Sequence, residues 1–204
     1  MTENQRKLLV ATNNPGKLLE WLALMEGIPV TLESLNDWKQ IIEVEETGST
    51  FIENAGLKAS GYALQTGSPA IADDSGLEVE ALDGRPGVLS ARYGGPELSF
   101  ADKMAKLLGE MKVSGRTTRA ARFACAIAIA DESGNILSTT EGVCPGKIAF
   151  EPHGSNGFGY DPLFVPDGYD LTFGELSSEI KRKISHRARA FEQIIPFLRD
   201  YIVN

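Results

Sequence analysis

The stretch LLVATNNPGK, residues 8–17, decides the fold class of this chain. Its apolar start, Leu8–Ala11, predicts a buried strand, and the polar turn Thr12–Lys17 follows directly. Apolar residues then recur at helical spacing over residues 18–25. A strand, a glycine-containing turn and a helix in this order are typical of α/β proteins, and they expose helix N–H groups to an anion.

The same alternation continues through the rest of the chain. Thr50 and Glu53 have the spacing of a capping box, which predicts a helix that ends near Gly67. Other strands are expected at residues 30–33, 69–73, 122–130 and 136–143, and other helices at residues 99–111, 178–184 and 185–202. Because strands alternate with helices early and a hairpin turn comes late, we expect an α/β fold with a mixed β-sheet.

The bulk properties are those of an ordinary globular chain of 204 residues, for which we expect one domain over residues 1–204. The net charge of −8 argues against a nucleic-acid partner. The N-terminus carries no secretory signal, and the longest apolar run, Phe123–Ala130, is too short to span a bilayer. Cys125 and Cys144 lack metal-ligand spacing, so we expect them to be reduced and structural, which fits a cytoplasmic protein. We expect no membrane partner.

A basic cluster near the C-terminus could bind a small anion despite the negative net charge. Residues 181–189 contain five of the 20 Lys and Arg residues, together with His186. His186 and Arg187 fall in the first turn of the last predicted helix, so an imidazole and a guanidinium lie beside free helix N–H donors. The alternative is a solvated basic helix face.

The turn Thr12–Lys17 is a candidate phosphate-binding element. Its Thr and Asn side chains offer small hydrogen-bonding groups, Gly16 permits close approach of a ligand, and Lys17 adds a positive charge. Its spacing is not that of a Walker A loop. An ordinary Asn-Pro-Gly turn before a helix is the alternative.

Four acids could hold a divalent cation. Asp73 and Asp74 follow an apolar strand, and such ions prefer oxygen ligands on a rigid base. Neighbouring strand residues point to opposite faces, so one acid would face the ligand and the other would support it. Glu45 and Glu46 lie upstream in an acidic loop, where the alternative for Glu46 is a solvated surface acid.

The segment GFGYDP, residues 157–162, could hold a nucleobase. Its two aromatic rings offer stacking faces, and stacking on a base contributes about 1–3 kcal/mol. Its carboxylate precedes a proline, which favours an extended backbone. The alternative is a packed aromatic turn.

Taken in order, these segments resemble the inosine/xanthosine triphosphate pyrophosphatases, HAM1-like enzymes that remove non-standard purine nucleotides. The six matching motifs are TNNPGK (12–17), EETG (45–48) with FIENA (51–55), IADDSG (71–76), PG (86–87) with SARY (90–93), GFGYDP (157–162), and SHR (185–187). Each is weak alone, but six ordered motifs over almost the whole chain are highly specific. The first motif has Asn13 where some members carry glycine.

The resemblance implies an elongated α/β fold with a central mixed β-sheet flanked by helices, and two lobes with the active cleft between them. It also implies a homodimer that uses Mg²⁺ to hydrolyse ITP, dITP and XTP to the monophosphate and pyrophosphate. Asp74 corresponds to the proton acceptor and to a metal ligand, and Glu45, or Glu46 after a slip in register, to a second metal ligand. The substrate-binding positions correspond to Thr12, Asn13, Asn14, Pro15, Gly16, Lys17, Ser75, Phe158, Gly159, Tyr160, Asp161, Lys181, His186 and Arg187.

The expected chemistry is attack of water on the α-phosphorus. Donors from His186 and Arg187 would pair with the C6 oxygen of inosine or xanthosine, and the C6 amine of adenine would face another donor. Rejection of guanine needs a further group, Lys181 or Asp161. Two alternatives remain: a related pyrophosphatase for pyrimidine or modified nucleotides, and a nucleotide-binding module without turnover.

Overall fold

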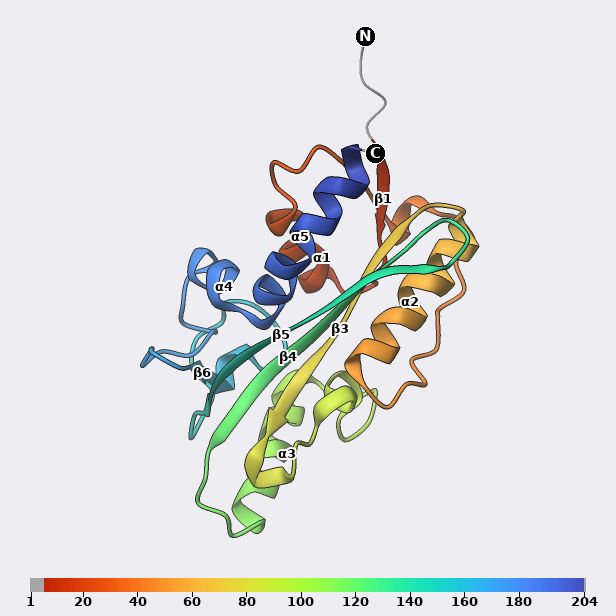
Figure 1. Cartoon of the computed structure of the whole chain (residues 1–204). Coiled ribbons are helices and arrows are strands. Elements are labelled where there is room, and N and C mark those ends of the chain that lie inside the picture. Colours follow the sequence, from red (N-terminus) through yellow and green to blue (C-terminus); the bar gives the residue numbers. More distant parts are fainter. Residues whose placement is uncertain (1–5, 204) are drawn as a thin grey trace. The chain divides into compact units, whose positions relative to one another are not determined.

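The computed structural model describes residues 6–203 (Figure 1) and, within them, a six-stranded sheet in the order β2-β1-β3-β4-β5-β6. The strands are β1 (Lys7–Val10), β2 (Thr31–Ser34), β3 (Ala70–Val79), β4 (Ala120–Ala130), β5 (Ile136–Ile148) and β6 (Phe164–Pro166). The helices are α1 (Pro15–Leu24), α2 (Phe51–Thr66), α3 (Phe100–Val113), α4 (Ser178–Ile184) and α5 (His186–Val203). Short 3-10 turns occupy Leu35–Asp37, Glu80–Leu82, Gly87–Arg92 and Asp161–Leu163.

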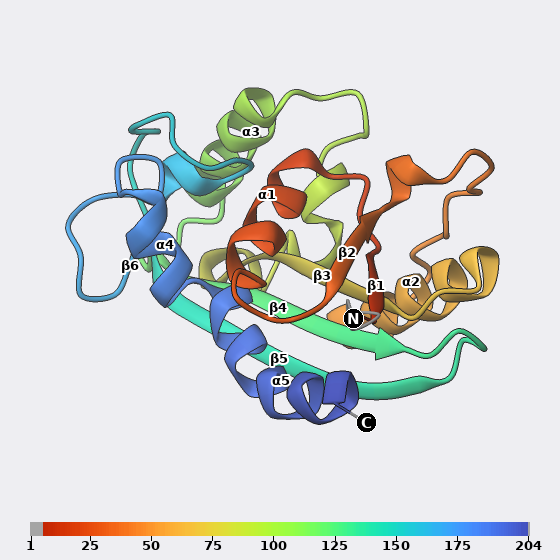
Figure 2. The same cartoon turned by 90° about the horizontal axis from the view of Figure 1, so that it is seen from above.

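The sheet is mixed, so the predicted α/β class is confirmed. β1 runs parallel to β2 and to β3, where Val10 lies opposite Ile71. β5 and β6 run antiparallel, with Lys147 opposite Val165. β4 and β5 lie side by side and are joined by the tight turn 131–135, which Figure 2 shows from above.

β3 is longer than the sequence predicts and does not end at the paired acids. It runs through Asp73, Asp74 and Ser75 to Val79. The strand continues because Leu77 and Val79, both fully buried, extend the period-two pattern beyond the acids. The paired acids therefore sit inside a long strand, where the backbone holds them rigidly.

The ends of the other elements follow mostly from local sequence. The predicted capping box of α2 is present, because Thr50 Oγ1 accepts from Glu53 N at 3.2 Å and Glu53 Oε2 accepts from Thr50 N at 3.1 Å. Gly67 ends α2 in the left-handed conformation, with φ 63°. α4 matches its predicted bounds, whereas β5 extends five residues further than predicted and β6 was not predicted. Among residues 6–203, no helix combines the length and the apolar character needed to cross a membrane.

The chain divides into two compact units. The first holds the residues up to Asp74, residues 125–142, and the residues from Arg187 onward. The second holds residues 75–124 and 143–186. The strands β3, β4 and β5 contribute residues to both units. The single domain expected over residues 1–204 stays a prediction.

The core of the first unit lies where α1 and α5 pack on β1, β3 and β4. Figure 1 shows these two helices on one side of the strands and α2 on the other. The ring of Trp21 on α1 meets Phe191 on α5 edge to face, with centroids 5.8 Å apart. The cluster comprises Leu8, Val10, Trp21, Met25, Ile71, Cys125, Ile127, Ile129, Ala190, Phe191, Ile194 and Leu198.

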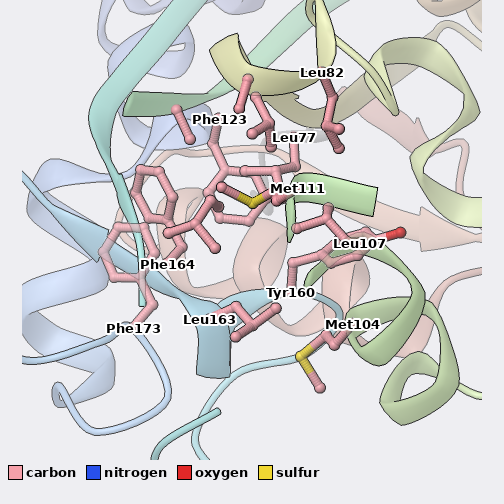
Figure 3. Packing of buried hydrophobic residues seen from close by; sticks show 14 of the residues in the cluster. Leu77, Leu82, Met104, Leu107, Met111, Phe123, Tyr160, Leu163, Phe164 and Phe173 are labelled. Atoms are coloured by element: carbon pink, nitrogen blue, oxygen red, sulfur yellow. The ribbon is translucent and has the colours of Figure 1, made fainter. Parts of the chain in front are cut away.

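The core of the second unit is rich in aromatic rings (Figure 3). Phe123 on β4 packs against Phe164 with centroids 4.7 Å apart, and Phe164 packs against Phe173 at 5.4 Å. Leu107 on α3 is fully buried in the same cluster, as is Leu163. Burial of a side chain of this size contributes about 1.5–3 kcal/mol, so this cluster stabilises the loops that surround it.

Candidate active site

Asp73 and Asp74 point to opposite faces of β3, as the alternation of strand residues predicts. Asp73 makes its contacts with α1 and α5, and Asp74 makes its contacts with α2. Both belong to the first unit and both are buried, with 1% and 5% of their surface exposed. The two carboxylates therefore occupy two different environments.

Asp73 is the centre of a buried ion-pair network. Its Oδ2 accepts from Arg187 Nη2 at 2.8 Å and lies 2.9 Å from Lys17 Nζ. Its Oδ1 accepts from Trp21 Nε1 at 2.9 Å. Arg187 also pairs with Glu20, and its guanidinium is 0% exposed. The network ties α1 and the start of α5 to β3.

The charge of Asp73 is fixed by this network. Burial opposes ionisation, but the charges of Arg187, Lys17 and Lys58 outweigh it, so the pKa of Asp73 lies well below its usual value. A carboxylate with so low an affinity for protons is a poor proton acceptor near neutral pH. The low pKa and the ion pairs of Asp73 favour a supporting role for it, which stays a prediction.

Asp74 is held from α2 and from the loop before it. Its Oδ2 accepts from Asn54 Nδ2 at 3.1 Å, and its Oδ1 accepts from Lys58 Nζ at 3.4 Å. Lys58 also donates to Glu46 Oε1 at 2.5 Å. Asn54 and Lys58 are four residues apart and lie on one face of the helix. One ammonium group therefore bridges the carboxylates of Asp74 and Glu46.

The environment of Asp74 favours the uptake of a proton. Burial raises its pKa above the ordinary value and the charge of Glu46 adds to this effect, whereas Lys58 and Lys17 oppose it. The same carboxylates outweigh the burial of Lys58 and raise the pKa of its ammonium, which stays charged. A carboxylate of raised pKa beside a fixed cation is suited to proton transfer.

Glu46, rather than Glu45, is the acid that the structure places beside Asp74. Glu46 reaches Asp74 through the shared ammonium of Lys58. Glu45 is exposed, and within residues 6–203 its carboxylate makes no hydrogen bond or ion pair. The sequence left open whether Glu45 or Glu46 is the second metal-site acid, and the geometry favours Glu46. The same residues contain no group of three or more His, Cys, Asp or Glu side chains arranged to hold a metal ion.

The turn Thr12–Lys17 uses its N–H donors internally. Asn14 Oδ1 accepts from Gly16 N at 2.9 Å and from Lys17 N at 3.1 Å, and Thr12 Oγ1 accepts from Asn14 N at 3.1 Å. The expectation that these N–H groups are free for an anion is therefore wrong, because the cap of α1 already occupies them. Lys17 still adds a positive charge to the turn, and Asn13 and Pro15 are exposed.

The predicted base-binding segment belongs to the second unit and is held by a buried ion pair. Asp161 Oδ2 accepts from Phe158 N at 2.8 Å and pairs with Lys181 Nζ. The ammonium of Lys181 lies 4.7 Å from the ring centre of Phe158. A Cβ on Gly157 would lie 2.0 Å from Asp161 Oδ2, so only glycine fits there. The structure brings these predicted residues together as one cluster.

The remaining predicted residues, Ser75, His186 and Arg187, flank in sequence the boundaries between the two units. His186 is 5% exposed and its ring stacks on Phe123, with centroids 4.8 Å apart and planes 16° apart. Ser75 is half-buried on β3. Arg187 is turned toward Asp73 and Glu20, so its known partners are protein carboxylates. A direct contact between Arg187 and a base stays a prediction that these ion pairs do not favour.

Sequence reasoning missed four residues of these networks. Lys58 and Asn54 project from α2 toward Asp74, and Trp21 and Glu20 project from α1 toward Asp73 and Arg187. The signal for the first pair was a lysine and an asparagine at helical spacing on a mostly apolar face. No comparable signal marks Glu20, because its partner lies 167 residues away.

Comparison with known proteins gives one consistent result. Residues 8–197 match the Ham1 family. A curated protein named dITP/XTP pyrophosphatase, from an Exiguobacterium species, is 47% identical over 197 residues, 95% of this chain and 99% of that protein.

Solved structures agree with the sequence matches. A HAM1 protein from Coxiella burnetii superposes with a TM-score of 0.87 at 39% identity, covering 96% of this chain and 99% of that one. A nucleoside-triphosphatase, also named dITP/XTP pyrophosphatase, from Mycobacterium abscessus superposes with a TM-score of 0.73 at 44% identity. That match covers 93% of this chain and 99% of the other.

Proposed function

This chain belongs to the Ham1 family, and from that premise we propose that it hydrolyses ITP, dITP and XTP to the nucleoside monophosphate and pyrophosphate. The observation that carries the proposal is the cluster of Asp74, Glu46 and Lys58 on α2, its preceding loop and β3. It combines a carboxylate of raised pKa, a second acid and a fixed cation, which are the groups that phosphoryl chemistry requires.

The acids at this cluster fit a magnesium ion. Mg²⁺ is usually bound by one or two carboxylates, with water and substrate phosphate oxygens as its other ligands, so Asp74 and Glu46 would suffice. The ammonium of Lys58 already bridges the two carboxylates, which shows that they favour a positive charge between them. When bound, the metal would neutralise charge on the phosphate oxygens.

The protein groups then have distinct roles in the proposed reaction. Asp74 accepts the proton of the water that attacks the α-phosphorus, because its pKa lies closer to neutrality than that of Asp73. The charges of Lys58 and Lys17 attract the polyphosphate and stabilise the leaving pyrophosphate. Asp73 holds Lys17 in place by a buried ion pair, and Arg187 in turn pairs with Asp73.

We propose that the cluster of the second unit recognises the base. Phe158 supplies a stacking face, and Lys181 supplies a donor for the C6 oxygen that inosine and xanthosine share. Asp161 orients the ammonium of Lys181, and His186 is a second donor. The C6 amine of adenine would face donors only, and such a mismatch costs about 1–3 kcal/mol.

The family resemblance also supports a homodimer and a cytoplasmic location, and both are part of the proposal. Light scattering of the purified protein should give about twice the mass of the 22.1 kDa chain. A mass of one chain at micromolar concentration would remove the dimer from the proposal.

A substrate panel tests the function. ITP, dITP, XTP, GTP, ATP, dTTP and UTP are supplied with Mg²⁺, and released pyrophosphate is measured. We expect ITP, dITP and XTP to exceed ATP by roughly tenfold or more in kcat/KM. Preference for dTTP or UTP would favour a pyrimidine enzyme, and tight binding without turnover would favour a binding module.

Variants of the acids test the assignment of the site. Asp74→Asn should lower kcat by at least about 100-fold with the fold retained, since general base catalysis contributes about that much. Glu46→Gln should also lower kcat and weaken the apparent affinity for Mg²⁺, whereas the matched control Glu45→Gln should change neither. If Glu45→Gln lowered kcat and the affinity for Mg²⁺ while Glu46→Gln changed neither, Glu45 would be the second metal ligand.

A further inference from the structure

Lys103, on α3 in the second unit, is a buried cation that none of the proposed roles uses. Only 3% of its surface is exposed. Its Nζ donates to the backbone oxygen of Ala91 at 2.7 Å, and among residues 6–203 no carboxylate pairs with it. Burying a charge without a counter-ion is costly. We therefore expect the hydrogen bond and ring contact of this ammonium to have a structural role.

The carbonyl that accepts from Lys103 lies at the C-terminal end of the 3-10 turn Gly87–Arg92. Carbonyl groups at the end of a helical turn lack partners within it and carry partial negative charge. An ammonium at this end satisfies one such group and holds the end of the turn. Lys103 therefore ties the turn Gly87–Arg92 to α3.

The same ammonium holds an aromatic ring that packs behind the proposed base-binding segment. Lys103 Nζ lies 4.9 Å from the ring centre of Phe100. The ring of Phe100 meets Tyr160 edge to face, with centroids 5.5 Å apart and planes at 88°. A Cβ on Gly159 would lie 3.5 Å from the Phe100 ring, so this ring supports the backbone at Gly159 and Tyr160.

A second contact joins the turn and the segment directly. Tyr160 donates from its hydroxyl to the backbone oxygen of Ser90 at 3.1 Å, and Tyr160 is 3% exposed. Ser90 is itself anchored, because its Oγ accepts from Leu77 N at 2.9 Å and donates to Gly87 O at 2.6 Å. Figure 3 shows Tyr160 among Met104 and Leu107 of α3. The turn Gly87–Arg92, the ring of Phe100 and the segment Phe158–Asp161 thus pack together as one cluster.

We propose that Lys103 is a positioning residue for the nucleobase: its ammonium fixes the turn Gly87–Arg92 and the ring of Phe100, and these set the position of Phe158–Asp161. This role rests on the proposed function, since it assigns the segment Phe158–Asp161 to the base. It makes base recognition depend on a side chain that touches neither substrate nor metal. Small displacements of such a supporting group reduce binding strongly, because the contact geometry of the segment is lost.

The test compares Lys103→Met with two matched variants. Lys103→Met keeps the length and the apolar stem but removes the donor and the charge, and Lys103→Arg restores both. Lys106→Met, one turn along α3, removes a cation that pairs with Glu110 instead. For Lys103→Met we expect KM for ITP to rise roughly three- to tenfold with kcat nearly unchanged, with recovery in Lys103→Arg and no change in Lys106→Met.

Two inhibitors separate positioning of the base from a general loss of structure. Inhibition by inosine, which carries the base and the ribose but no phosphate, should weaken in Lys103→Met by the same factor as KM. Inhibition by inorganic triphosphate should stay as in the unchanged protein. Equal weakening of both inhibitors, or no change in either, would overturn the proposal. If Lys103→Met fails to fold, Lys103→Gln, which keeps a donor without the charge, takes its place.

Hydrogen exchange gives a readout that does not depend on activity. Amides of residues 157–163 should exchange at least about tenfold faster in Lys103→Met, while those of α2 stay unchanged. Unchanged exchange at residues 157–163 would refute the positioning role even if the enzyme hydrolyses ITP. If the exchange is faster in Lys103→Met but the unchanged protein hydrolyses none of the nucleotides in the substrate panel, Lys103 still positions residues 157–163. In that case the proposed function is refuted instead.

Discussion

Replacement of Arg187 by methionine should destabilise the protein strongly, although the residue lies at the proposed active site. Arg187 is 0% exposed at its side chain and pairs with two carboxylates, Asp73 and Glu20. Methionine fills most of the same apolar space, so the main loss is electrostatic. The carboxylate of Asp73 would then stay buried without Arg187, while Lys17 Nζ still lies 2.9 Å from it.

The size of the effect follows from this burial. Removal of one partner of a buried ion pair costs about 3–5 kcal/mol, because the other charge is left without compensation. We expect a loss of about 3 kcal/mol, at the low end of this range, since Lys17 and Trp21 still bind Asp73. With a total stability of about 5–15 kcal/mol, the variant would remain folded at low temperature.

Urea denaturation followed by circular dichroism measures this loss. The midpoint should fall by roughly 1 M urea or more, given an m-value of about 1–3 kcal/mol per M. Arg199→Met is the matched control, because Arg199 is exposed on the same helix and should change stability by less than about 0.5 kcal/mol.

A double-mutant cycle decides whether the pair with Asp73 is responsible. Asp73→Asn removes the charge that Arg187 compensates. The double variant should therefore lose about 1–3 kcal/mol less stability than the sum of the losses in the two single variants. Additive losses would contradict the reasoning. So would an Arg187→Met variant as stable as the unchanged protein.

Two further predictions concern the second unit. Hydrogen bonds, with that to Lys106 contributing most, lower the pKa of Glu110 from 4.5 to about 2. The resulting stabilisation is complete above about pH 4.5 and is lost as the pH falls through about 2. Urea denaturation should therefore show Glu110→Gln less stable by about 1 kcal/mol at pH 7, with a gap that shrinks toward zero as the pH falls to about 2 and below; a constant gap would contradict this. Gly157→Ala should lower the thermal midpoint and raise KM for ITP, because its Cβ would lie 2.0 Å from a carboxylate oxygen of the same loop. Gly168 is the control, because its φ of +85° is similar to the +71° of Gly157 but an added Cβ would meet no atom within 4 Å. Gly168→Ala should therefore cost only about 1 kcal/mol of backbone strain and leave KM unchanged. Equal KM values in the two variants would refute the clash at Gly157.

Features set by local sequence were predictable. The capping box of α2 depends only on Thr50, Glu53 and the residues between them, and it formed as expected. The divergence of Asp73 and Asp74 follows from strand geometry alone. These features need no knowledge of the rest of the chain.

Features that depend on distant partners were not predictable. The end of β3 was misplaced because Ser75 and Gly76 are common in turns, whereas the burial of Leu77 and Val79 extends the strand. The ion pairs of Arg187 were not predicted, because its carboxylate partners lie 114 and 167 residues away in the sequence. No periodicity in a sequence identifies such pairs.

The position of bond cleavage is the most direct test of the proposed reaction. ITP is hydrolysed with Mg²⁺ in water enriched in ¹⁸O, and the products are analysed by mass spectrometry. If water attacks the α-phosphorus, the label enters the phosphate of inosine monophosphate and pyrophosphate is released without label. Label in pyrophosphate, or release of orthophosphate in its place, would contradict it.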